Sequence, residues 1–475
     1  MIRLRSLYFR LAAFLICAAT LAAPAFGQWK VGAAAIEITP DLPMWMSGYG
    51  SRTRPANSVA LKMNAKALAL EDATGRVVVI VTTDLLGIPR VLRQGVEARV
   101  QQQYGVFPEN LLINASHTHC GPELRGVETS LSKADADRAK KVAAYQAETE
   151  ERLVAVVGQA LARREPAALF FGQAKAGIAM NRRANYKLAP ADFRHGKVPN
   201  PDGPVDHDVP ILQVKTPDGK MQAVLFGYAC HNTTSGEDIF HGDYAGFAQA
   251  ALEATYPGTV ALFMLGCAGD QNPYPRHNSS PGRTSIDLAK LHGQTLASAV
   301  EAGLNAFPRP VSGPLRAVME NVALPYLPAP TRSQLNERLA SKAKADREYA
   351  QVLLEILDRD GRLPANYSYP VQVLQFGKDL TLVALASETV VDFSHRLKRE
   401  LPGPAVWVAG YSNDFLGYIP SRRIWEEGGY EGGGSLTYYQ STLWRIIHPN
   451  IWDPSVEELI VGKVHELARK VSGNR

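Results

Sequence analysis

Cysteine is scarce in this chain of 475 residues, which contains 4 cysteines. One of them, Cys17, falls within the first 27 residues, and no two cysteines form a CxxC pair, so the usual structural zinc finger is excluded. The remaining three, Cys120, Cys230 and Cys267, are an odd number and cannot all pair. We expect small buried thiols, and one disulfide among them stays open if the compartment is oxidising.

Several signatures of catalysis and binding are also absent. The chain has no G-x-S-x-G elbow, no H-E-x-x-H helix, no P-loop and no glycine fingerprint leading from a strand into a helix. The formal net charge of +5 is too small and too scattered to indicate nucleic-acid binding, and it supports at most transient contact with an anionic membrane surface. No obligate protein partner is evident. After residue 27 no run of 18 apolar residues occurs, so we expect a soluble mature chain.

The first 27 residues have the composition of a leader. Arg3, Arg5 and Arg10 give a positive start, Leu11 to Ala23 is apolar, and Ala25-Phe26-Gly27 offers small residues at the cleavage positions. This pattern is typical of a secretory signal peptide, and the apolar run is short for a bilayer span. We therefore expect residues 1–27 to be a signal peptide and the protein to be secreted or periplasmic. An uncleaved N-terminal anchor is the alternative.

Strand-like and helix-like segments alternate through residues 28–475, without a Gly/Ser- or Pro-rich linker and without an internal repeat. This alternation favours a single α/β domain. Pairs such as 61–71 with 77–84 are separated by short turns, so we predict a mixed β-sheet core flanked by helices. Residues 333–357 predict one polar surface helix, and residues 410–439 predict a long loop rich in glycine and tyrosine.

Reactive side chains recur directly after the C-terminal ends of apolar segments, where α/β proteins bind their ligands. They are Asp84, His117, His231, Asp270 and Glu388. His117 and His119 follow the predicted strand 110–114, and in extended backbone residues two apart face the same way. Two histidines and a carboxylate form a recurring catalytic zinc set, which lowers the pKa of a bound water to about 7. Hydrogen-bonded loop histidines are the alternative interpretation.

Four segments taken together resemble the neutral (alkaline, non-lysosomal) ceramidases. They are Ala35-Ile-Glu-Ile-Thr-Pro40, Ser116-His-Thr-His-Cys-Gly-Pro122, Ala268-Gly-Asp-Gln-Asn-Pro273 and Asn413-Asp-Phe-Leu-Gly-Tyr418. The resemblance runs from about residue 31 to about residue 439. It implies a neutral-ceramidase-like catalytic domain with one catalytic Zn²⁺. It further implies cleavage of a ceramide-like N-acyl amide by attack of zinc-bound water, with a fatty acid and a sphingoid base as products.

The same resemblance implies roles for individual residues. The zinc ligands would be His117, His231, Glu388 and Tyr418. The residues that contact the substrate or stabilise the oxyanion would be His119, Arg182 and Tyr430. The residues that support the ligands and substrate contacts would be Asp84, Asp243 and Asp270, and Asp84 would orient a ligand histidine.

Two features depart from the family pattern. The serine of its Gly-Asp-x-Ser-Pro segment is replaced here by Asn272, and an amide is not a nucleophile of that kind. If zinc-activated water attacks directly, Asn272 could still bind substrate or support the oxyanion, which is the interpretation we favour. We also expect the family's C-terminal β-sandwich domain to be absent. These departures leave open a hydrolase of a different amide or ester, or a non-catalytic zinc-containing binding protein.

Overall fold

The larger of two mixed sheets forms the centre of the computed structural model, which describes residues 28–124, 135–183, 199–276, 282–438 and 448–473. The predicted signal peptide, residues 1–27, lies outside these ranges. The strand order is β4 (Leu111–Ala115), β3 (Val77–Thr83), β2 (Asn64–Asp72), β1 (Trp29–Glu37), β5 (Glu165–Lys175), β7 (Asp208–Lys215), β8 (Met221–Tyr228) and β9 (Val260–Leu265), with β11 (Arg309–Val311) beside β5. The pairs β3–β4 and β8–β9 are parallel, and the other pairs are antiparallel.

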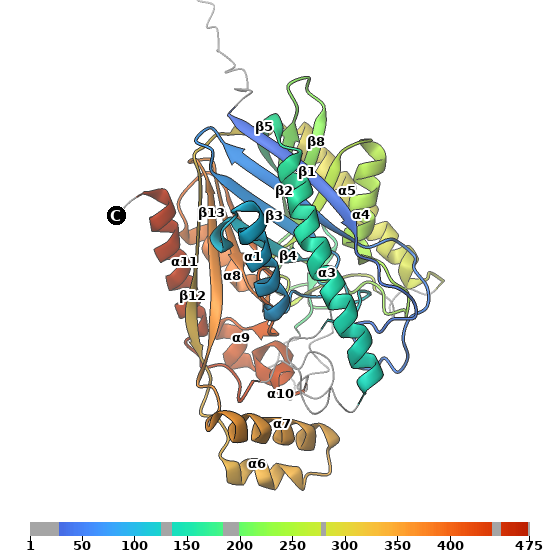
Figure 1. Ribbon diagram of the computed structural model, residues 1–475, viewed down its shortest axis with the longest axis vertical. Coiled ribbons are helices and arrows are strands. Elements are labelled where there is room, and N and C mark those ends of the chain that lie inside the picture. The colour runs from blue at the N-terminus through green and yellow to red at the C-terminus, as the bar shows by residue number, and fades with distance from the viewer. Residues whose placement is uncertain (1–27, 125–134, 184–198, 277–281, 439–447, 474–475) are drawn as a thin grey trace, which may run out of the picture.

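The second sheet has the order β12 (Leu315–Pro325), β13 (Asn366–Phe376), β14 (Leu380–Leu385) and β16 (Val406–Ala409), and its pair β14–β16 is parallel. Its apolar side chains share one buried cluster with those of the larger sheet, so the two sheets pack face to face. Helices cover the outer faces: α1 (Arg90–Tyr104), α3 (Ala136–Ala162), α4 (Asp243–Thr255) and α5 (Ser285–Asn305) on the larger sheet, and α8 (Val391–Glu400) and α11 (Val456–Ser472) on the smaller (Figure 1). The predicted mixed α/β fold is confirmed.

Strand β2 illustrates why the central strands are apolar on both faces. Ala67 and Ala69 belong to the cluster under α1 and α3, whereas Leu68 and Leu70 belong to the cluster between the sheets. The alternation follows from the two-residue period of a strand. Small residues let α3 approach closely, and at Gly32 in β1 an added β-carbon would lie 2.0 Å from Ala160 O of that helix. Helix, sheet, sheet and helix therefore form four layers.

A side chain joins the two outermost strands of the larger sheet. Asn114 in β4 accepts a hydrogen bond from Leu265 N in β9 at 2.9 Å, and its Nδ2 donates to Gly410 O, just after β16, at 2.8 Å. A β-bridge between Gly266 and Ala409 also joins the end of β9 to the end of β16. The C-terminal ends of β4, β9 and β16 are thus held together, and the loops that follow them face one another.

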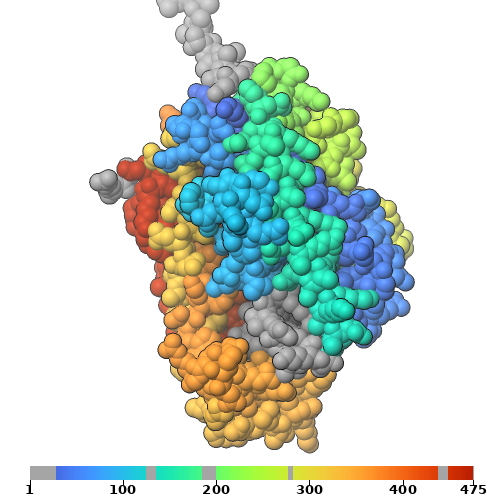
Figure 2. Space-filling model, viewed as in Figure 1, coloured from blue at the N-terminus to red at the C-terminus, as the bar shows by residue number. Residues whose placement is uncertain are grey.

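Two predicted segments differ from the structure. Residues 333–357 fold as two helices, α6 (Arg332–Leu339) and α7 (Lys344–Asp360), which pack together as a lobe at one end of the molecule (Figure 1, Figure 2). The break lies at Ser341, whose hydroxyl accepts from Ala343 N at 3.2 Å and donates to Asp346 at 2.8 Å. These side-chain bonds replace the bonds that a continuous helix would make.

The second difference is the predicted loop 410–439. Its described part contains β17 (Tyr418–Ile419), α9 (Arg422–Glu427), the π-helical turn η3 (Tyr430–Gly434) and α10 (Ser435–Tyr438). Gly428, Gly429 and Gly433 have positive φ and let the chain turn between these short elements. The three predicted buried thiols are confirmed, because Cys120, Cys230 and Cys267 are free and buried. Among the described helices none is long and apolar enough to cross a membrane.

Candidate metal centre

Segments that follow strands of both sheets bring the predicted ligands together. His117 and His119 follow β4, and His231 follows β8. Glu388 opens β15 (Glu388–Thr389), which pairs in parallel with β17 so that Glu388 lies opposite Tyr418. All five side chains belong to residues that are at most 9% exposed. Residues from four distant parts of the sequence therefore meet in one buried place.

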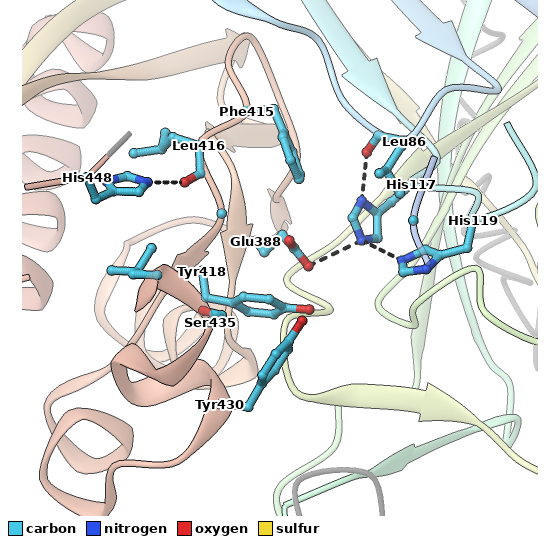
Figure 3. A pocket seen from close by; sticks show the side chains of 13 residues that line it. Leu86, His117, His119, Glu388, Phe415, Leu416, Tyr418, Tyr430, Ser435 and His448 are labelled. Atoms are coloured by element: carbon cyan, nitrogen blue, oxygen red, sulfur yellow. Dashed lines mark hydrogen bonds and ion pairs between the residues drawn. The ribbon is translucent and has the colours of Figure 1, made fainter. Parts of the chain in front are cut away.

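The donor atoms of four of these residues converge, and Figure 3 shows three of them, those of His117, Glu388 and Tyr418. Glu388 Oε2 lies 3.2 Å from His117 Nε2 and 3.2 Å from His231 Nε2. Tyr418 Oη lies 3.2 Å from His231 Nε2. Atoms about 2.1 Å from one ion at the corners of a tetrahedron lie about 3.4 Å from one another. These three spacings match those of donors that share one tetrahedral metal ion.

The two histidines are held in the tautomer that a metal requires. His117 Nδ1 lies 2.6 Å from Leu86 O, and His231 Nδ1 lies 2.6 Å from Ala268 O. A carbonyl oxygen only accepts, so each Nδ1 carries a proton and each Nε2 of the neutral ring has a free electron pair.

Electrostatics agree with this assignment. Burial, assisted by the positive charge of Arg182, lowers the pKa of His231 to about 3, so its ring is neutral. Burial opposes ionisation of Glu388, but His117 and His231 outweigh it and hold the pKa of this carboxyl well below its usual range. An ionised carboxylate beside two imidazole rings is a donor set that suits a divalent cation.

The His117 loop does not have the extended backbone that we expected. His117 has a φ of +59°, in the left-handed region that is strained for a residue with a side chain. Its backbone N donates to Leu85 O at 2.9 Å, and that of His119 donates to Asn232 O at 3.1 Å. The two rings nevertheless converge, with their Nε2 atoms 3.2 Å apart. The convergence comes from this anchored turn and not from the alternation of a strand.

His119 is distinguished by an atom without a partner. Its Nδ1 is buried and has no hydrogen-bond partner in the described part of the chain. Burial lowers the pKa of His119 well below its usual range, so the ring is neutral and offers one donor and one acceptor nitrogen. One ring nitrogen from each of His117, His119 and His231 lies within 4.8 Å of the other two. His119 is therefore placed to act on a molecule bound beside the ligands.

Arg182 connects the metal donors to a second polar group. It follows β6 (Ala179–Asn181), which pairs with β10 (Gln271–Pro273). Its Nη2 donates to Tyr418 Oη at 2.8 Å and its Nη1 to Asn272 Oδ1 at 3.2 Å. Its Nε donates to Glu431 Oε1 at 2.8 Å. All three nitrogens thus bond to the protein, which gives Arg182 a structural task beside the substrate contact that we predicted.

Asn272 presents an amide with a fixed orientation. It is fully buried, and its Oδ1 accepts from Arg182 Nη1 and from Thr233 Oγ1, each at 3.2 Å. Two donors on the oxygen leave Nδ2 pointing elsewhere, and this nitrogen has no partner among the described residues. Asn272 therefore holds a buried donor nitrogen in a fixed orientation beside Arg182.

The three predicted supporting carboxylates have different surroundings. Asp270 accepts from Asn181 Nδ2 at 3.0 Å and from Val391 N at 2.8 Å, and its carbonyl accepts from Arg182 N at 2.9 Å. It therefore braces the segments that carry Arg182 and Glu388, as a supporting residue should.

The prediction that Asp84 orients a ligand histidine is wrong. Its carboxylate bonds to Asn64 N at 2.9 Å and to Gln249 Nε2 at 3.3 Å, and the Nδ1 of His117 is oriented by Leu86 O instead. Asp243 bonds to Ser235 N and to Tyr244 N, so it stabilises the start of α4 and not a ligand. In both cases a backbone amide accounts for the carboxylate.

A second cluster of potential ligands is formed by Cys120, His241 and Asp243. Here the histidine is in the wrong tautomer, because His241 Nδ1 accepts from Asp243 N at 3.0 Å and Nε2 must then carry the proton. Burial also raises the pKa of the Cys120 thiol to about 12. These residues fit a metal poorly, so we place the metal centre at the first cluster.

A small pocket opens beside the donors. Its polar lining residues include His117, His119, Glu388, Tyr418 and Tyr430 (Figure 3). Its apolar lining residues are Leu86, Phe415, Leu416 and Leu436. Tyr430 points its hydroxyl toward that of Tyr418, and the two rings are 5.1 Å apart between centroids (Figure 3). The pocket can hold an apolar chain whose polar end lies at the donors.

Sequence reasoning missed Glu431, Arg183 and Leu86. Glu431 lies next to the predicted Tyr430 and Arg183 next to the predicted Arg182, but their contact joins segments 248 positions apart. Leu86 contributes only its backbone carbonyl. No pattern in a single sequence indicates either the Arg183–Glu431 ion pair or the hydrogen bond to the Leu86 carbonyl.

Comparisons with known proteins agree on one family. The chain is 26% identical over 272 residues to the neutral ceramidase of Pseudomonas aeruginosa, a match that covers 54% of this chain and 39% of that relative. Its fold matches the crystal structure of neutral ceramidase from Pseudomonas aeruginosa with a TM-score of 0.71 and 20% identity, over 94% of this chain and 75% of the other. A ceramidase complexed with C2 matches with a TM-score of 0.70 and 18% identity, over the same shares of the two chains.

The family model described as neutral/alkaline non-lysosomal ceramidase, N-terminal, matches residues 29–283, more than half of the chain. This span contains the histidines at 117, 119 and 231 as well as Arg182 and Asn272. The chain therefore belongs to the neutral/alkaline non-lysosomal ceramidase family.

Proposed function

We propose that this protein is a zinc-dependent hydrolase that cleaves a ceramide-like N-acyl amide into a fatty acid and a sphingoid base. The observation that carries the proposal is the convergence of His117, His231, Glu388 and Tyr418, with successive donor atoms 3.2 Å apart and both histidines in the ligand tautomer. A Zn²⁺ ion at these donors supplies Lewis-acid activation of water and of the amide carbonyl.

The surrounding residues suit the chemistry of amide hydrolysis. His119 has an unpartnered Nδ1, and a neutral ring there can take the proton from the attacking water. The water oxygen bonds to the carbonyl carbon, the C–N bond breaks, and the proton passes to the leaving amine. Asn272 Nδ2 and the hydroxyl of Tyr430 are the donors that we assign to the carbonyl oxygen as negative charge develops on it.

The apolar lining of the pocket supports an acyl chain as part of the substrate. Leu86, Phe415 and Leu416 are at most 4% exposed in the whole molecule yet line the pocket. Burying an apolar chain against them releases about 25 cal/mol per Å² and keeps water other than the reacting molecule away from the donors. A lipid amide, with a polar linkage beside an apolar chain, matches both kinds of lining residue.

The test combines metal analysis with turnover. We expect one zinc per chain and release of fatty acid from a fluorescent N-acyl sphingosine, with both lost in His117→Ala. His241→Gln is the matched control, because that histidine belongs to the second cluster and should leave zinc and activity in place. Fatty-acid release that persists after complete removal of zinc would overturn the proposal.

A second candidate function is supported by Asn272. This residue replaces the serine of the family pattern, and the chain spans 39% of the curated relative that it matches. The same centre could then hydrolyse a different amide or an ester, or bind zinc and ligand without turnover. A panel of short-chain and long-chain amides and esters separates these outcomes. Cleavage of long-chain ceramides alone would exclude the different substrate, and any zinc-dependent turnover would exclude the binding protein.

A further inference from the structure

Two neighbouring arginines share one buried carboxylate beside the metal centre. Glu431 is 1% exposed, and its Oε1 accepts from Arg182 Nε at 2.8 Å while its Oε2 accepts from Arg183 Nη1 at 2.6 Å. Removing this carboxylate would leave two buried guanidinium groups without their shared counter-charge. The carboxylate therefore determines where both arginines lie.

The two arginines face different parts of the molecule. Arg182 reaches inward, to Tyr418 Oη and Asn272 Oδ1. Arg183 reaches outward, to Glu427 Oε2 at 3.1 Å and Gly428 O at 3.0 Å. Only the inner arginine connects Glu431 to a metal donor. A purely structural ion pair would not need this connection, so the two halves of the network can be tested separately.

The guanidinium transmits position because it is planar and rigid. When Glu431 fixes Nε of Arg182, the direction of Nη2 is fixed as well. Nη2 lies 2.8 Å from Tyr418 Oη, which in turn lies 3.2 Å from His231 Nε2. The tyrosine oxygen accepts from Arg182 on one side and so directs another lone pair toward the histidines and Glu388.

The backbone around Glu431 is shaped for this contact. Glu431 lies in the short turn η3, between α9 and α10, which is kinked at Gly433. The next residue is Gly432, where an added β-carbon would lie 2.6 Å from Ile424 O of α9. A larger residue would push η3 away from α9, and the carboxylate would move away from Arg182.

We propose that Glu431 is a positioning residue of the metal centre, which acts through Arg182 to hold the Tyr418 oxygen at the ion. The inference rests on the proposed function, because it takes Tyr418 as a ligand. It assigns to Glu431 a role in ligand geometry beyond its contribution to folding.

The test uses the full chain stripped of metal and reconstituted with Co²⁺, whose visible absorption reports the number and arrangement of ligands. Glu431→Gln should change the Co²⁺ spectrum in the same way as Tyr418→Phe and should weaken zinc binding by about 10-fold to 100-fold. The control is Glu427→Gln, which removes a carboxylate from Arg183 and from Arg423 but leaves the contacts of Arg182 in place. Its spectrum should equal that of the wild type, and its zinc affinity should change by less than about twofold.

Arg182→Lys tests the positioning role of Glu431 if Glu431→Gln does not fold. A lysine keeps the positive charge but cannot bridge Glu431 and Tyr418, so it should give the spectrum of Tyr418→Phe. If Glu431→Gln folds and keeps the wild-type Co²⁺ spectrum and zinc affinity, the positioning role is overturned. If Glu431→Gln does not fold, the same result in Arg182→Lys overturns it. A wild-type protein that binds neither Co²⁺ nor zinc overturns the proposed function itself, so the two failures are distinct.

Discussion

Gly48 lies so close to the imidazole of His119 that a β-carbon on it would be 2.5 Å from His119 Cγ. The glycine has a φ of +94° and lines the pocket beside the histidine. It therefore sets the position of the His119 ring, which has no hydrogen bond on Nδ1 to hold it. A side chain at position 48 would have to displace that ring.

Gly48→Ala should therefore reduce activity and spare the metal. We expect kcat/KM to fall by about 100-fold, because a displacement of about 1 Å is enough to misplace a proton-transferring group. Zinc content should stay at the wild-type level, since His119 is not a proposed ligand. Gly75→Ala is the matched control, because Gly75 has a φ of +81° but nothing within 4 Å of an added β-carbon. Equal activity losses in both variants would contradict the role of Gly48.

Replacement of Asn272 should distinguish a hydrogen-bond donor from a lost nucleophile. Asn272→Asp removes the unpartnered Nδ2 donor, and we expect kcat/KM to fall by about 100-fold. Asn272→Ser should also lose activity, because a serine is too short to replace the amide between Arg182, Thr233 and the substrate. Steady-state hydrolysis of an N-acyl sphingosine measures both. Activity of Asn272→Ser well above the wild type would show that the family serine is needed for attack.

Stability of the metal-free protein should fall as the pH is lowered from about 6.5 to about 4. His448 is buried between Tyr326 Oη at 2.9 Å and Leu416 O at 2.6 Å, and burial lowers its pKa to about 4 from the usual 6.5. Between these values the unfolded chain binds a proton that the folded chain does not. The free energy of unfolding should therefore decrease by about 3 kcal/mol across this window through His448.

Other buried histidines also contribute to the pH dependence of the free energy of unfolding. The contribution of His448 is therefore measured by comparing the wild type with His448→Gln. Glutamine keeps one donor and one acceptor but does not titrate. Urea unfolding of the metal-free protein at several pH values should give a shallower dependence for this variant. Identical pH dependences would show that folding does not change the pKa of His448.

Asn114 should be needed for stability as well as for the site. Asn114→Ala leaves Leu265 N buried without its partner, whereas Gly410 O keeps the hydrogen bond from Ser412 Oγ. We expect the free energy of unfolding to fall by about 1–3 kcal/mol, the cost of one buried unsatisfied donor. The exposed Asn366 at the start of β13 provides the control, and its alanine variant should change stability by less than about 0.5 kcal/mol. A similar stability for both variants would contradict the joining of β4 to β9.

The sequence allowed the fold class and the main donors to be predicted because both depend on local patterns. Val77 to Thr83 is apolar on both faces, and His117 and His231 directly follow such segments. The family motifs add Glu388 and Tyr418, which occupy facing positions of β15 and β17. Strand ends and short motifs are properties of neighbouring residues, so a single chain reveals them.

The remaining features depend on residues far apart in the chain. Arg182 and Glu431 are 249 positions apart, and no local pattern indicates that they form an ion pair. Asp84 follows an apolar strand just as His117 does, yet a backbone amide takes its carboxylate. Ser341 interrupts a polar segment that looks helical throughout, because its hydroxyl competes with the backbone.

The central claim is that one ion is held by residues from both sheets, and anomalous diffraction at the zinc edge tests it most directly. Crystals of the zinc-loaded protein should give one strong peak within about 2.3 Å of His117 Nε2, His231 Nε2 and Glu388. A peak at Cys120, His241 and Asp243 instead, or no peak from protein that was supplied with zinc, would contradict the account.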